Sequence, residues 1–288
     1  MIPMNPDEKV NKNEEEFIIS ELNSIKDTFS KNISLLADNN IELVKLIVSQ
    51  KNELAKEMNQ QLVKGVTDLA NFIAQKNHQE YIQIEALFSI YSVLDLRYPM
   101  PPMRGWPISP DFGNLVMKQI LDQDLNPNLL FELGSGVSSV LSGYCFEKRG
   151  KGSVLSIDHD ASFSQLSQKM LKNHGLQNYV KIHHTPLVKT KLKGNEFLWY
   201  DLKILEPVEP IDILVIDGPP GYQQKMARYP AVPLLHKYLR DGAVILVDDA
   251  NRPDEQEMVK RWLSEYKDLS AEEVKTEKGA VILRKKAA

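Results

Sequence analysis

Acidic residues close the apolar segments that lie between residues 129 and 249 of this 288-residue chain. In chain order, these acids are Glu132, Asp158, Asp217, Asp248 and Asp249. Apolar segments that alternate with helical ones predict a parallel sheet, and ligands bind beyond the carboxyl ends of its strands. We therefore expect these acids to share one site. Carboxylates in such a site can bind a cation, accept hydrogen bonds from hydroxyl groups or take up a proton.

A glycine turn, with Gly134 and Gly136, follows the first of these segments. Glycine has no side chain, so the backbone can approach a ligand closely. A dinucleotide-binding turn has glycine or alanine where position 139 falls, but this chain has Ser139. The turn therefore favours a cofactor without a pyrophosphate group, and an ordinary strand-to-helix turn is the alternative. Asp158, about two dozen residues later, is placed to accept hydrogen bonds from ribose hydroxyls.

Asp217, Asp248 and Asp249 are predicted to bring three carboxylates to one edge of the sheet. Three carboxylates at such short distances repel one another unless a cation or protons lie between them. Magnesium prefers oxygen ligands and keeps waters that leave room for substrate oxygens. Bound there, it would lower the pKa of a substrate hydroxyl. The alternative is a metal-free site in which Asp217 or Asp249 acts alone as the base.

The elements that would position these residues alternate along the chain. The predicted strands are Leu129–Leu133, Ser153–Asp158, Val180–His184, Ile211–Asp217 and Ala243–Asp248. The predicted helices are Ser109–Leu121, Ser138–Glu147, Ser162–His174, Ala231–Leu239 and Pro253–Tyr266. The final segments, Glu272–Thr276 and Ala280–Arg284, flank a Glu-Lys-Gly turn and predict an antiparallel hairpin.

A long amphipathic segment, residues 13–78, precedes this region and holds one glycine and no proline. Its apolar residues follow spacings of three, four or seven, which predict helices with partial heptads. They include Ile18, Leu22, Ile25, Phe29, Leu36, Leu43 and Leu46, and later Leu62, Val66, Leu69, Phe72 and Ile73. We expect a coiled coil that makes a homo-oligomer. The alternative is two helices, broken at Asp38–Asn40, that pack on their own catalytic domain.

Four prolines and a glycine in residues 97–107 exclude regular structure and indicate a hinge. We therefore divide the chain into a helical, coiled-coil-like region, 1–96, and a catalytic domain, 97–288. The hinge's arginines and aromatics are candidates for a substrate mouth, and a rigid linker is the alternative.

The bulk composition excludes several classes of protein. A formal net charge of −4 argues against a nucleic-acid binder. Cys145 is the single cysteine, so no internal disulfide forms, which fits a reducing compartment. Met1–Lys9 lacks the apolar core of a secretory signal, and no apolar run is long enough for a membrane span. We expect a cytoplasmic protein.

From Met100 to Leu263 the chain resembles a bacterial family of class I S-adenosylmethionine-dependent methyltransferases, often associated with glycan or secondary-metabolite genes. The segments that carry the resemblance are Arg104-Gly105-Trp106, Ser109-Pro110-Asp111, 132–139, Trp199-Tyr200-Asp201, 217–221, 228–231 and 248–252. It implies an α/β fold with a Rossmann-like sheet of parallel strands, closed by a C-terminal antiparallel hairpin and preceded here by the helical arm. It also implies S-adenosylmethionine as the cofactor.

The resemblance also assigns roles to residues. The cofactor-binding set it implies is Glu132, Gly134, Ser135, Gly136, Ser138, Asp158, His159 and Asp217. More distantly, the chain is similar to catechol O-methyltransferase and to macrocin-type sugar O-methyltransferases, whose matching acids hold magnesium. This implies Asp217, Asp248 and Asp249 as metal ligands and Asp217 and Asp249 as catalytic residues. The lysine base of the catechol enzyme is replaced here by Pro220, and Lys225 is a candidate substitute.

The function expected from these observations is methyl transfer to the hydroxyl of a sugar or glycan, assisted by magnesium. A metal-independent methyltransferase for another small-molecule acceptor is one alternative. A non-catalytic scaffold with a relic methyltransferase domain is another. A nicotinamide oxidoreductase is disfavoured by Ser139.

Overall fold

The structure is a computed structural model that describes residues 12–205 and 210–287. The segment Met1–Lys9, predicted to carry no secretory signal, lies outside these residues. By its internal contacts the chain divides into two units, Met1–Gln75 and Lys76–Ala288. Among the described residues, no helix combines the length and the apolar character that a membrane span requires.

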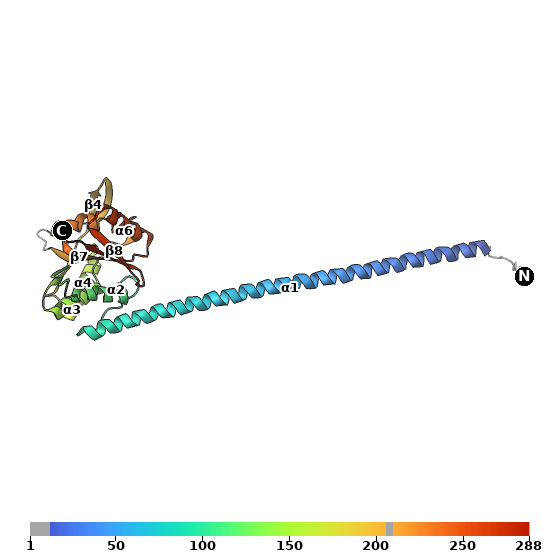
Figure 1. Cartoon of the computed structure of the whole chain (residues 1–288), viewed down its shortest axis with the longest axis horizontal. Coiled ribbons are helices and arrows are strands. Elements are labelled where there is room, and N and C mark those ends of the chain that lie inside the picture. Colours follow the sequence, from blue (N-terminus) through green and yellow to red (C-terminus); the bar gives the residue numbers. More distant parts are fainter. Residues whose placement is uncertain (1–11, 206–209, 288) are drawn as a thin grey trace, which may run out of the picture. The chain divides into compact units, whose positions relative to one another are not determined.

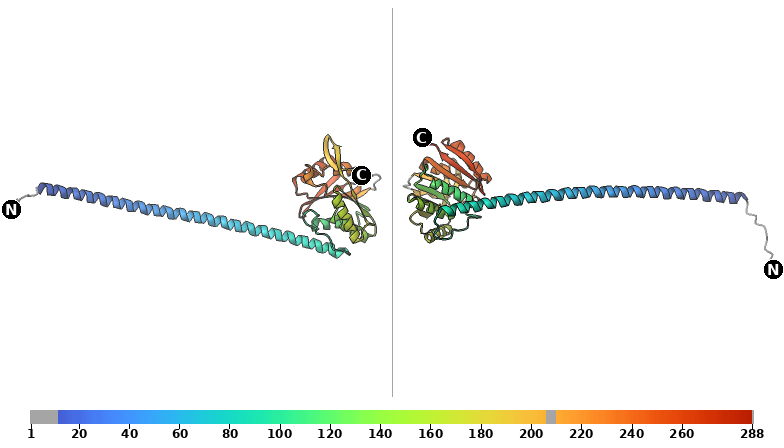
Figure 2. Two further views of the ribbon diagram at one scale, coloured as in Figure 1. Left: turned by 180° about the vertical axis from the view of Figure 1, so that it is seen from behind. Right: turned by 60° about the horizontal axis from the view of Figure 1, so that its bottom comes forward.

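The N-terminal segment forms one helix, α1 (Lys12–Val93), which the ribbon views show without a break (Figures 1 and 2). The break considered at Asp38–Asn40 is therefore wrong. Asparagine and aspartate only weakly disfavour a helix interior, whereas proline would break it, and this helix contains none. Gly65 lowers the helix propensity at one position without ending the helix.

The catalytic unit is built on a seven-stranded sheet with the strand order β3-β2-β1-β6-β7-β9-β8. Its strands are β1 (Leu129–Leu133), β2 (Ser153–Asp158), β3 (Val180–His184), β6 (Ile211–Ile216), β7 (Leu239–Asp248), β8 (Leu269–Val274) and β9 (Ala280–Lys285). The first five are parallel, and β9 runs antiparallel to both β7 and β8. The predicted fold class, with its closing antiparallel hairpin, is confirmed.

Helices cover both faces of this sheet (Figure 1). They are α2 (Pro110–Leu121), α3 (Val137–Arg149), α4 (Ala161–His174), α5 (Ala231–Leu235) and α6 (Pro253–Glu265), with 3-10 turns η1 (Leu202–Leu205), η2 (Gly221–Gln223) and η3 (His236–Tyr238). Alternate strand residues enter different cores: Leu130 packs in the layer of α2, α3 and α4, and Phe131 in the layer of α5 and α6. Burial on both faces explains why the central strands β1 and β6 are mostly apolar.

A second, two-stranded sheet, β4 (Leu187–Leu192) and β5 (Asn195–Tyr200), was not predicted. Its turn consists of Lys193 and Gly194, whose φ angles of 49° and 81° are both positive. Two-residue turns of this kind match the twist of a hairpin and favour glycine. The Lys-Gly pair between two alternating segments was therefore a usable sequence signal.

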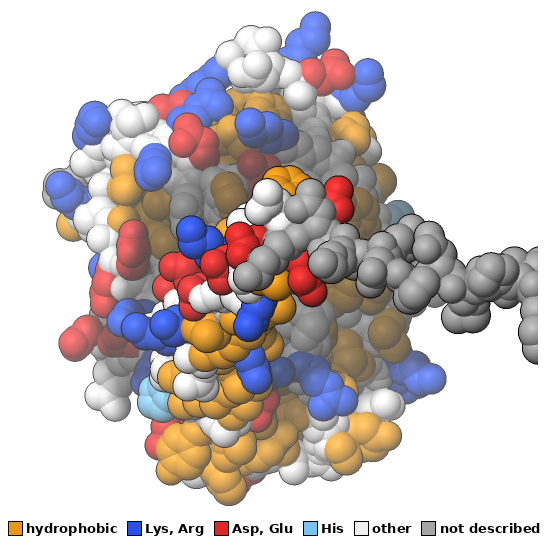
Figure 3. Space-filling view, turned by 90° about the vertical axis from the view of Figure 1, so that its right-hand side faces the viewer, with side chains coloured by type: hydrophobic (Ala, Val, Ile, Leu, Met, Phe, Trp, Pro, Cys, Tyr) orange, Lys and Arg blue, Asp and Glu red, His pale blue; other side chains and the backbone are white. Residues whose placement is uncertain are grey.

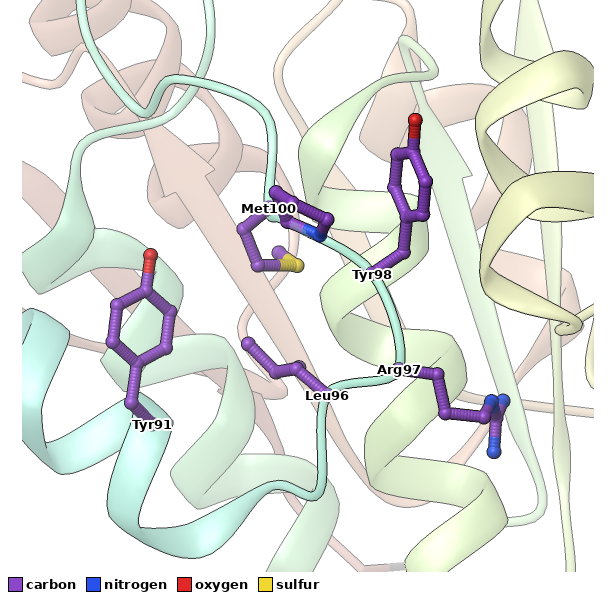
Figure 4. Close-up of a pocket in the computed structure, with 6 residues that line it drawn as sticks. Tyr91, Leu96, Arg97, Tyr98 and Met100 are labelled. Atoms are coloured by element: carbon purple, nitrogen blue, oxygen red, sulfur yellow. The ribbon is translucent and has the colours of Figure 1, made fainter.

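The linker after α1 is held by Arg97. Its side chain donates hydrogen bonds to the carbonyl of His174 at 2.7 and 3.0 Å and pairs with Glu147 at 2.7 Å. Its backbone N–H donates to the Tyr144 hydroxyl. Tyr91 and residues 96–100 line a shallow hollow of about 460 Å³ here (Figure 4). Arg97 thus satisfies a carbonyl at the end of α4, as the rigid-linker interpretation expects.

Candidate active site

The glycine turn lies where the strand order of the sheet reverses, between β1 and β6. Gly134 has a φ of +99°, which favours glycine. A Cβ added to Gly134 would lie 3.4 Å from the backbone nitrogen of Gly218, which directly follows Asp217. The turns after β1 and β6 are therefore side by side. Because both turns contain glycine, their backbones can approach each other closely. Such a crevice is where open α/β sheets bind ligands.

Asp158, at the end of β2, holds this turn in place. One of its carboxylate oxygens accepts hydrogen bonds from the backbone N–H and the hydroxyl of Ser135, both at 2.9 Å. The other accepts from the backbone N–H of Asp160 at 3.0 Å. His159 Nδ1 lies 3.6 Å from the same carboxylate. Asp158, His159 and Ser135 therefore form one group at the sheet edge, as the predicted cofactor site requires.

Glu132 lies deeper than the other acids. It is fully buried on the α3 side of the sheet, where the Ser139 hydroxyl donates to one carboxylate oxygen. The other oxygen has no hydrogen-bond partner. Burial raises the pKa of this carboxyl group. Ser138 is buried in the first turn of α3, and Gly136 precedes that helix. Glu132 therefore supports the turn from beneath.

Tyr200, at the end of β5, lies at the same edge of the sheet. Its side chain is buried, and its hydroxyl has no hydrogen-bond partner. A Cβ at Gly218 would overlap this hydroxyl. Burial and the nearby charge of Asp158 raise its pKa, with smaller contributions from Asp217 and Glu132. The acids at the ends of β1, β2 and β6 thus converge around one unsatisfied hydroxyl.

Asp217, Asp248 and Asp249 form the cluster that the sequence predicted. Each offers one carboxylate oxygen, and the three oxygens lie within 4.8 Å of one another. The cluster forms because β6 and β7 are parallel neighbours whose carboxyl ends coincide. Asp249 has a φ of +61°, in the left-handed region that non-glycine residues seldom adopt. Backbone strain of this kind concentrates at functional sites.

The turn of the C-terminal hairpin supports the loop that follows Asp249. Backbone N–H groups of Ala250 and Asn251 donate to the carbonyls of Gly279 and Lys278, at 3.0 and 3.1 Å. Gly279 has a φ of +76°, and a Cβ added there would overlap Asn251. The antiparallel hairpin is therefore part of the scaffold of the acidic cluster.

Arg228 enters the acidic cluster, a position that the sequence did not reveal. Its Nη2 lies 2.8 Å from Asp249 and 3.4 Å from Asp217, and its Nη1 lies 3.8 Å from Glu255. Its side chain is only 3% exposed. Burial opposes its charge, yet the surrounding acids more than offset this and raise its pKa.

Asp248 is the least satisfied acid of the cluster. It is fully buried, and neither carboxylate oxygen has a hydrogen-bond partner. Burial first, and then the charge of Asp249, raise its pKa to about 6. Burial and the charge of Asp248 also raise the pKa of Asp217 well above its ordinary value. A cation or a proton would satisfy the Asp248 carboxylate.

These pKa shifts predict the pH dependence of stability without divalent metal. Because the native state binds the Asp248 proton more tightly than the unfolded chain does, the free energy of unfolding falls as pH rises from about 4 to 6. A shift from 3.8 to about 6 corresponds to about 2–3 kcal/mol. Asp248→Asn is expected to flatten the curve by that amount in denaturant unfolding with a chelator present. Parallel curves for the two proteins would contradict the assignment.

A solvent-open hollow of about 460 Å³ adjoins the cluster. Its lining residues are Trp106, Gly221, Tyr222, Ala227, Arg252, Pro253, Asp254 and Glu255. Arg252 connects hollow and cluster, because its guanidinium lies 2.9 Å from Asp249. Trp106 and Tyr222 are both more than two-thirds exposed, with ring centroids 6.1 Å apart. Lys225, the candidate substitute base, is exposed on the loop between η2 and α5.

Residues 131–250, which contain the glycine turn, Asp158 and the acidic cluster, match a family described as a methyltransferase domain. The chain carries a class I, S-adenosylmethionine-dependent methyltransferase domain. It is therefore an enzyme, as the sequence predicted. The match begins within β1 and ends just after Asp249, so it spans the strands that hold the acids.

Several solved structures are similar to the chain. The O-methyltransferase from Bacillus cereus in complex with SAH has 17% sequence identity and a TM-score of 0.48, over 71% of this chain and 90% of that one. The SAH-bound Podospora anserina methyltransferase PaMTH1 has 15% identity and a TM-score of 0.49, over 71% and 87%. TomG from Streptomyces achromogenes, in complex with SAM, has 17% identity and a TM-score of 0.47, over 73% and 96%. No curated protein matches the chain at a significant level.

The methyltransferase domain thus brings the predicted site residues into two neighbouring groups. One contains the turn at Gly134–Gly136 with Asp158 and His159, and the other contains the three aspartates. Asp217 links them, since its backbone N–H donates to the carbonyl of Leu133 at 3.1 Å, directly before the glycine turn. Arg228 and Tyr200 complete the arrangement.

Proposed function

We propose that this domain transfers a methyl group from S-adenosylmethionine to a hydroxyl oxygen of a sugar or glycan, with magnesium held by the three aspartates. The observation that carries this proposal is the buried, unpartnered carboxylate of Asp248 between Asp217 and Asp249, beside an open hollow. A residual negative charge that no side chain satisfies suits a divalent cation with oxygen ligands.

The residues of the turn fit the cofactor in this proposal. Gly134 adds no side chain to the crevice, and the Tyr200 hydroxyl beside Gly218 has no hydrogen-bond partner. One oxygen of Glu132, beneath the turn, is also unsatisfied. We assign cofactor binding to Glu132, Gly134, Ser135, Gly136, Ser138, Asp158, His159 and Asp217. S-adenosylmethionine, when bound, supplies an electrophilic methyl group. The chain supplies its orientation, and holding both reactants in line accounts for much of the acceleration of such reactions.

The aspartates divide the remaining work. Asp217 is half-buried at the end of β6, and its raised pKa suits it to accept the proton of the acceptor hydroxyl. Asp249 pairs with both Arg228 and Arg252, so its carboxylate is held in one position. With Asp248 they would hold magnesium, which supplies charge stabilisation to a developing oxyanion.

The acceptor in this proposal binds in the hollow that Trp106 and Tyr222 help to line. Exposed aromatic faces at the mouth of a polar site suit the apolar face of a sugar ring, while Arg252 and Asp254 offer hydrogen bonds to its hydroxyls.

Trp106→Ala is expected to raise KM for the acceptor about 3- to 10-fold and to leave kcat within about twofold, because it removes contacts made equally in the ground and transition states. Steady-state kinetics with a sugar acceptor would measure this. Tyr91→Ala, an exposed aromatic on α1 that does not line this hollow, is the matched control. A loss confined to kcat would contradict binding by Trp106.

Two measurements together test the proposal as a whole: isothermal titration calorimetry for cofactor binding, and turnover assays with and without magnesium. Adenosylhomocysteine should bind the wild-type chain, and magnesium should raise the turnover of the wild type but not of Asp248→Asn. Cofactor binding with turnover insensitive to magnesium and chelator would favour a metal-independent methyltransferase. One observation supports that second candidate: Arg228 already neutralises part of the cluster. Absence of cofactor binding would favour the scaffold.

Two further parts of the proposal concern the setting of the enzyme. We place it in the cytoplasm. Its one cysteine, Cys145, supports this placement, because the side chain is buried and burial raises the pKa of the thiol. We also propose a homo-oligomer formed through the N-terminal helix.

A further inference from the structure

Helix α1 exposes an unusual amount of apolar surface. Twenty-two large apolar side chains from Ile18 to Ile73 are 48–66% exposed. Hydrophobic side chains at the surface are visible among charged ones in the space-filling view (Figure 3). Monomers seldom leave contiguous apolar surface of more than a few hundred Å² uncovered, so this helix face requires an occupant.

The apolar residues of α1 recur with a period of eleven. The repeated spacing of four, three and four residues passes through Ile18, Leu22, Ile25, Phe29, Ile33, Leu36, Asn40, Val44, Ile47, Lys51, Ala55, Met58, Leu62, Val66, Leu69 and Ile73. Fourteen of these sixteen positions are apolar, whereas a heptad frame started at Ile18 finds apolar residues at only seven of its first sixteen positions. The seven apolar positions of the heptad frame end at Leu46, so the partial heptads expected from the sequence describe only the first part of the helix. We call the sixteen positions the eleven-residue stripe.

This period determines how two such helices can pair. Eleven residues over three turns give 3.67 residues per turn, slightly more than the 3.6 of a straight helix. The stripe therefore winds slowly in the right-handed sense, opposite to the winding that heptads produce. Two helices that keep their stripes in contact would form a nearly straight or right-handed coiled coil. From Ile18 to Ile73 the contact would extend for about 80 Å.

Charge distinguishes between possible occupants of the stripe. Residues 18–73 carry six lysines and seven acids, so this segment has no excess of basic charge. Amphipathic helices that lie on anionic membranes are rich in Lys and Arg on their polar face, and this one is not. The charged residues alternate in sign at spacings of three or four, as in Glu42–Lys45 and Glu53–Lys56, which is typical of a solvated outer face of a coiled coil.

We propose that the eleven-residue stripe binds the same stripe of a second copy of this chain. The stripe is self-complementary, because the four-three-four spacing is the same in both directions and places apolar residues opposite apolar residues along nearly its whole length. Asn40 and Lys51 are its two polar interruptions, and single polar core positions of this kind commonly set register. This pairing does not depend on the reaction catalysed by the methyltransferase domain.

Two pairs of variants in the full chain test the eleven-residue period against the heptad. Leu62→Glu and Val66→Glu place a charge in the stripe. Gln60→Glu and Thr67→Glu place the same charge at positions that a heptad frame from Ile18 would bury but that lie outside the stripe. Analytical ultracentrifugation of the wild type should give at least twice the chain mass. The stripe variants should self-associate at least about 100-fold more weakly, because each assembly then buries two carboxylates.

The control variants should assemble like the wild type, and glutamate, a good helix former, keeps the arm helical in all four proteins. A wild-type protein that stays monomeric at the highest concentration measured would overturn the proposal. Dissociation by the control variants but not by the stripe variants would overturn it as well, in favour of a heptad contact.

Disulfide cross-linking gives the direction of pairing. Leu22→Cys alone should cross-link copies that run parallel in register. Copies that run antiparallel, centred between Lys45 and Leu46, should cross-link only when Leu22→Cys and Leu69→Cys chains are mixed. Cys145 is buried, so the unsubstituted chain is the control. Either cross-link supports contact through the stripe, and the absence of both would overturn it.

Discussion

Replacing Asp217 with asparagine is expected to lower kcat/KM for methyl transfer by about 10³-fold, within the range that general bases contribute. Asparagine preserves the shape of the side chain but accepts no proton and provides a weaker cation ligand. Asp217 is also the member of the acidic cluster that adjoins the glycine turn, so neither of the other two aspartates can take its place. Single-turnover assays at saturating cofactor would isolate the chemical step from binding.

Asp201→Asn is the matched control for this variant. Asp201 follows β5 and lies outside the three-carboxylate cluster, so its replacement should change the rate by no more than about twofold. Unfolding curves of both variants would show that they are folded. A rate for Asp217→Asn within tenfold of the wild type would rule out Asp217 as the proton acceptor and would point to Asp249 or to the exposed Lys225.

Replacing Arg228 with methionine is expected to lower the free energy of unfolding at pH 7 by about 3–5 kcal/mol, the usual cost of leaving buried charges unpaired. The guanidinium is surrounded by Asp217, Asp249 and Glu255. Among the described residues, Arg228 is the one arginine or lysine that is buried. The deficit should shrink at acidic pH. Carboxylates protonate there, and a neutral acid no longer requires the cation. Denaturant unfolding at several pH values would measure both effects.

Arg252→Met is the comparison for this second variant. Arg252 also pairs with Asp249, but its side chain is half exposed, and solvent-exposed pairs contribute under about 1 kcal/mol. Losses of equal size for the two arginines would show that burial does not determine the strength of these ion pairs. A loss for Arg228→Met that is independent of pH would show that packing, and not charge, is its main contribution.

The central strands and their acids were predictable because of where the sheet lies. Strands β1 and β6 are buried on both faces, so each is apolar apart from one acid, Glu132 in β1 and Asp212 in β6. Glu132 and Asp217 stand at the carboxyl ends of these strands, where polar residues resume. The acid at each strand end was therefore a reliable marker of the site. Parallel pairing then placed Asp217 beside Asp248 and Asp249 without further information.

Arg228 and Tyr200 could not be placed in this way. Arg228 is in a loop between η2 and α5, and loop paths are not set by hydrophobic periodicity. Tyr200 ends β5, a strand of the small hairpin that was itself missed. Their positions are fixed by tertiary contacts, the ion pairs of Arg228 and the overlap of Tyr200 with the Gly218 position, and no local pattern encodes these contacts.

For helix α1, the prediction differed from the finding in the period of the apolar residues. A seven-residue frame fits the first turns, Ile18 to Phe29, and then meets Asn32 and Asn39. The eleven-residue frame passes through Ile33 instead, and the two frames diverge from there. A period of eleven accommodates the helix without strain. Of the three residues that suggested a break, Asp38 and Asn39 lie outside the stripe and Asn40 is one of its two polar positions.

The packing of Gly279 against Asn251 carries an evolutionary consequence. Any substitution at 279 must push the loop that carries Asp249, so the hairpin and the catalytic loop cannot drift independently. Natural variants of this lineage should keep glycine at 279, because a Cβ there would overlap the backbone of Asn251 as well as its side chain. Selection that preserves catalysis should therefore also constrain the residue at position 279, about thirty residues beyond the aspartates.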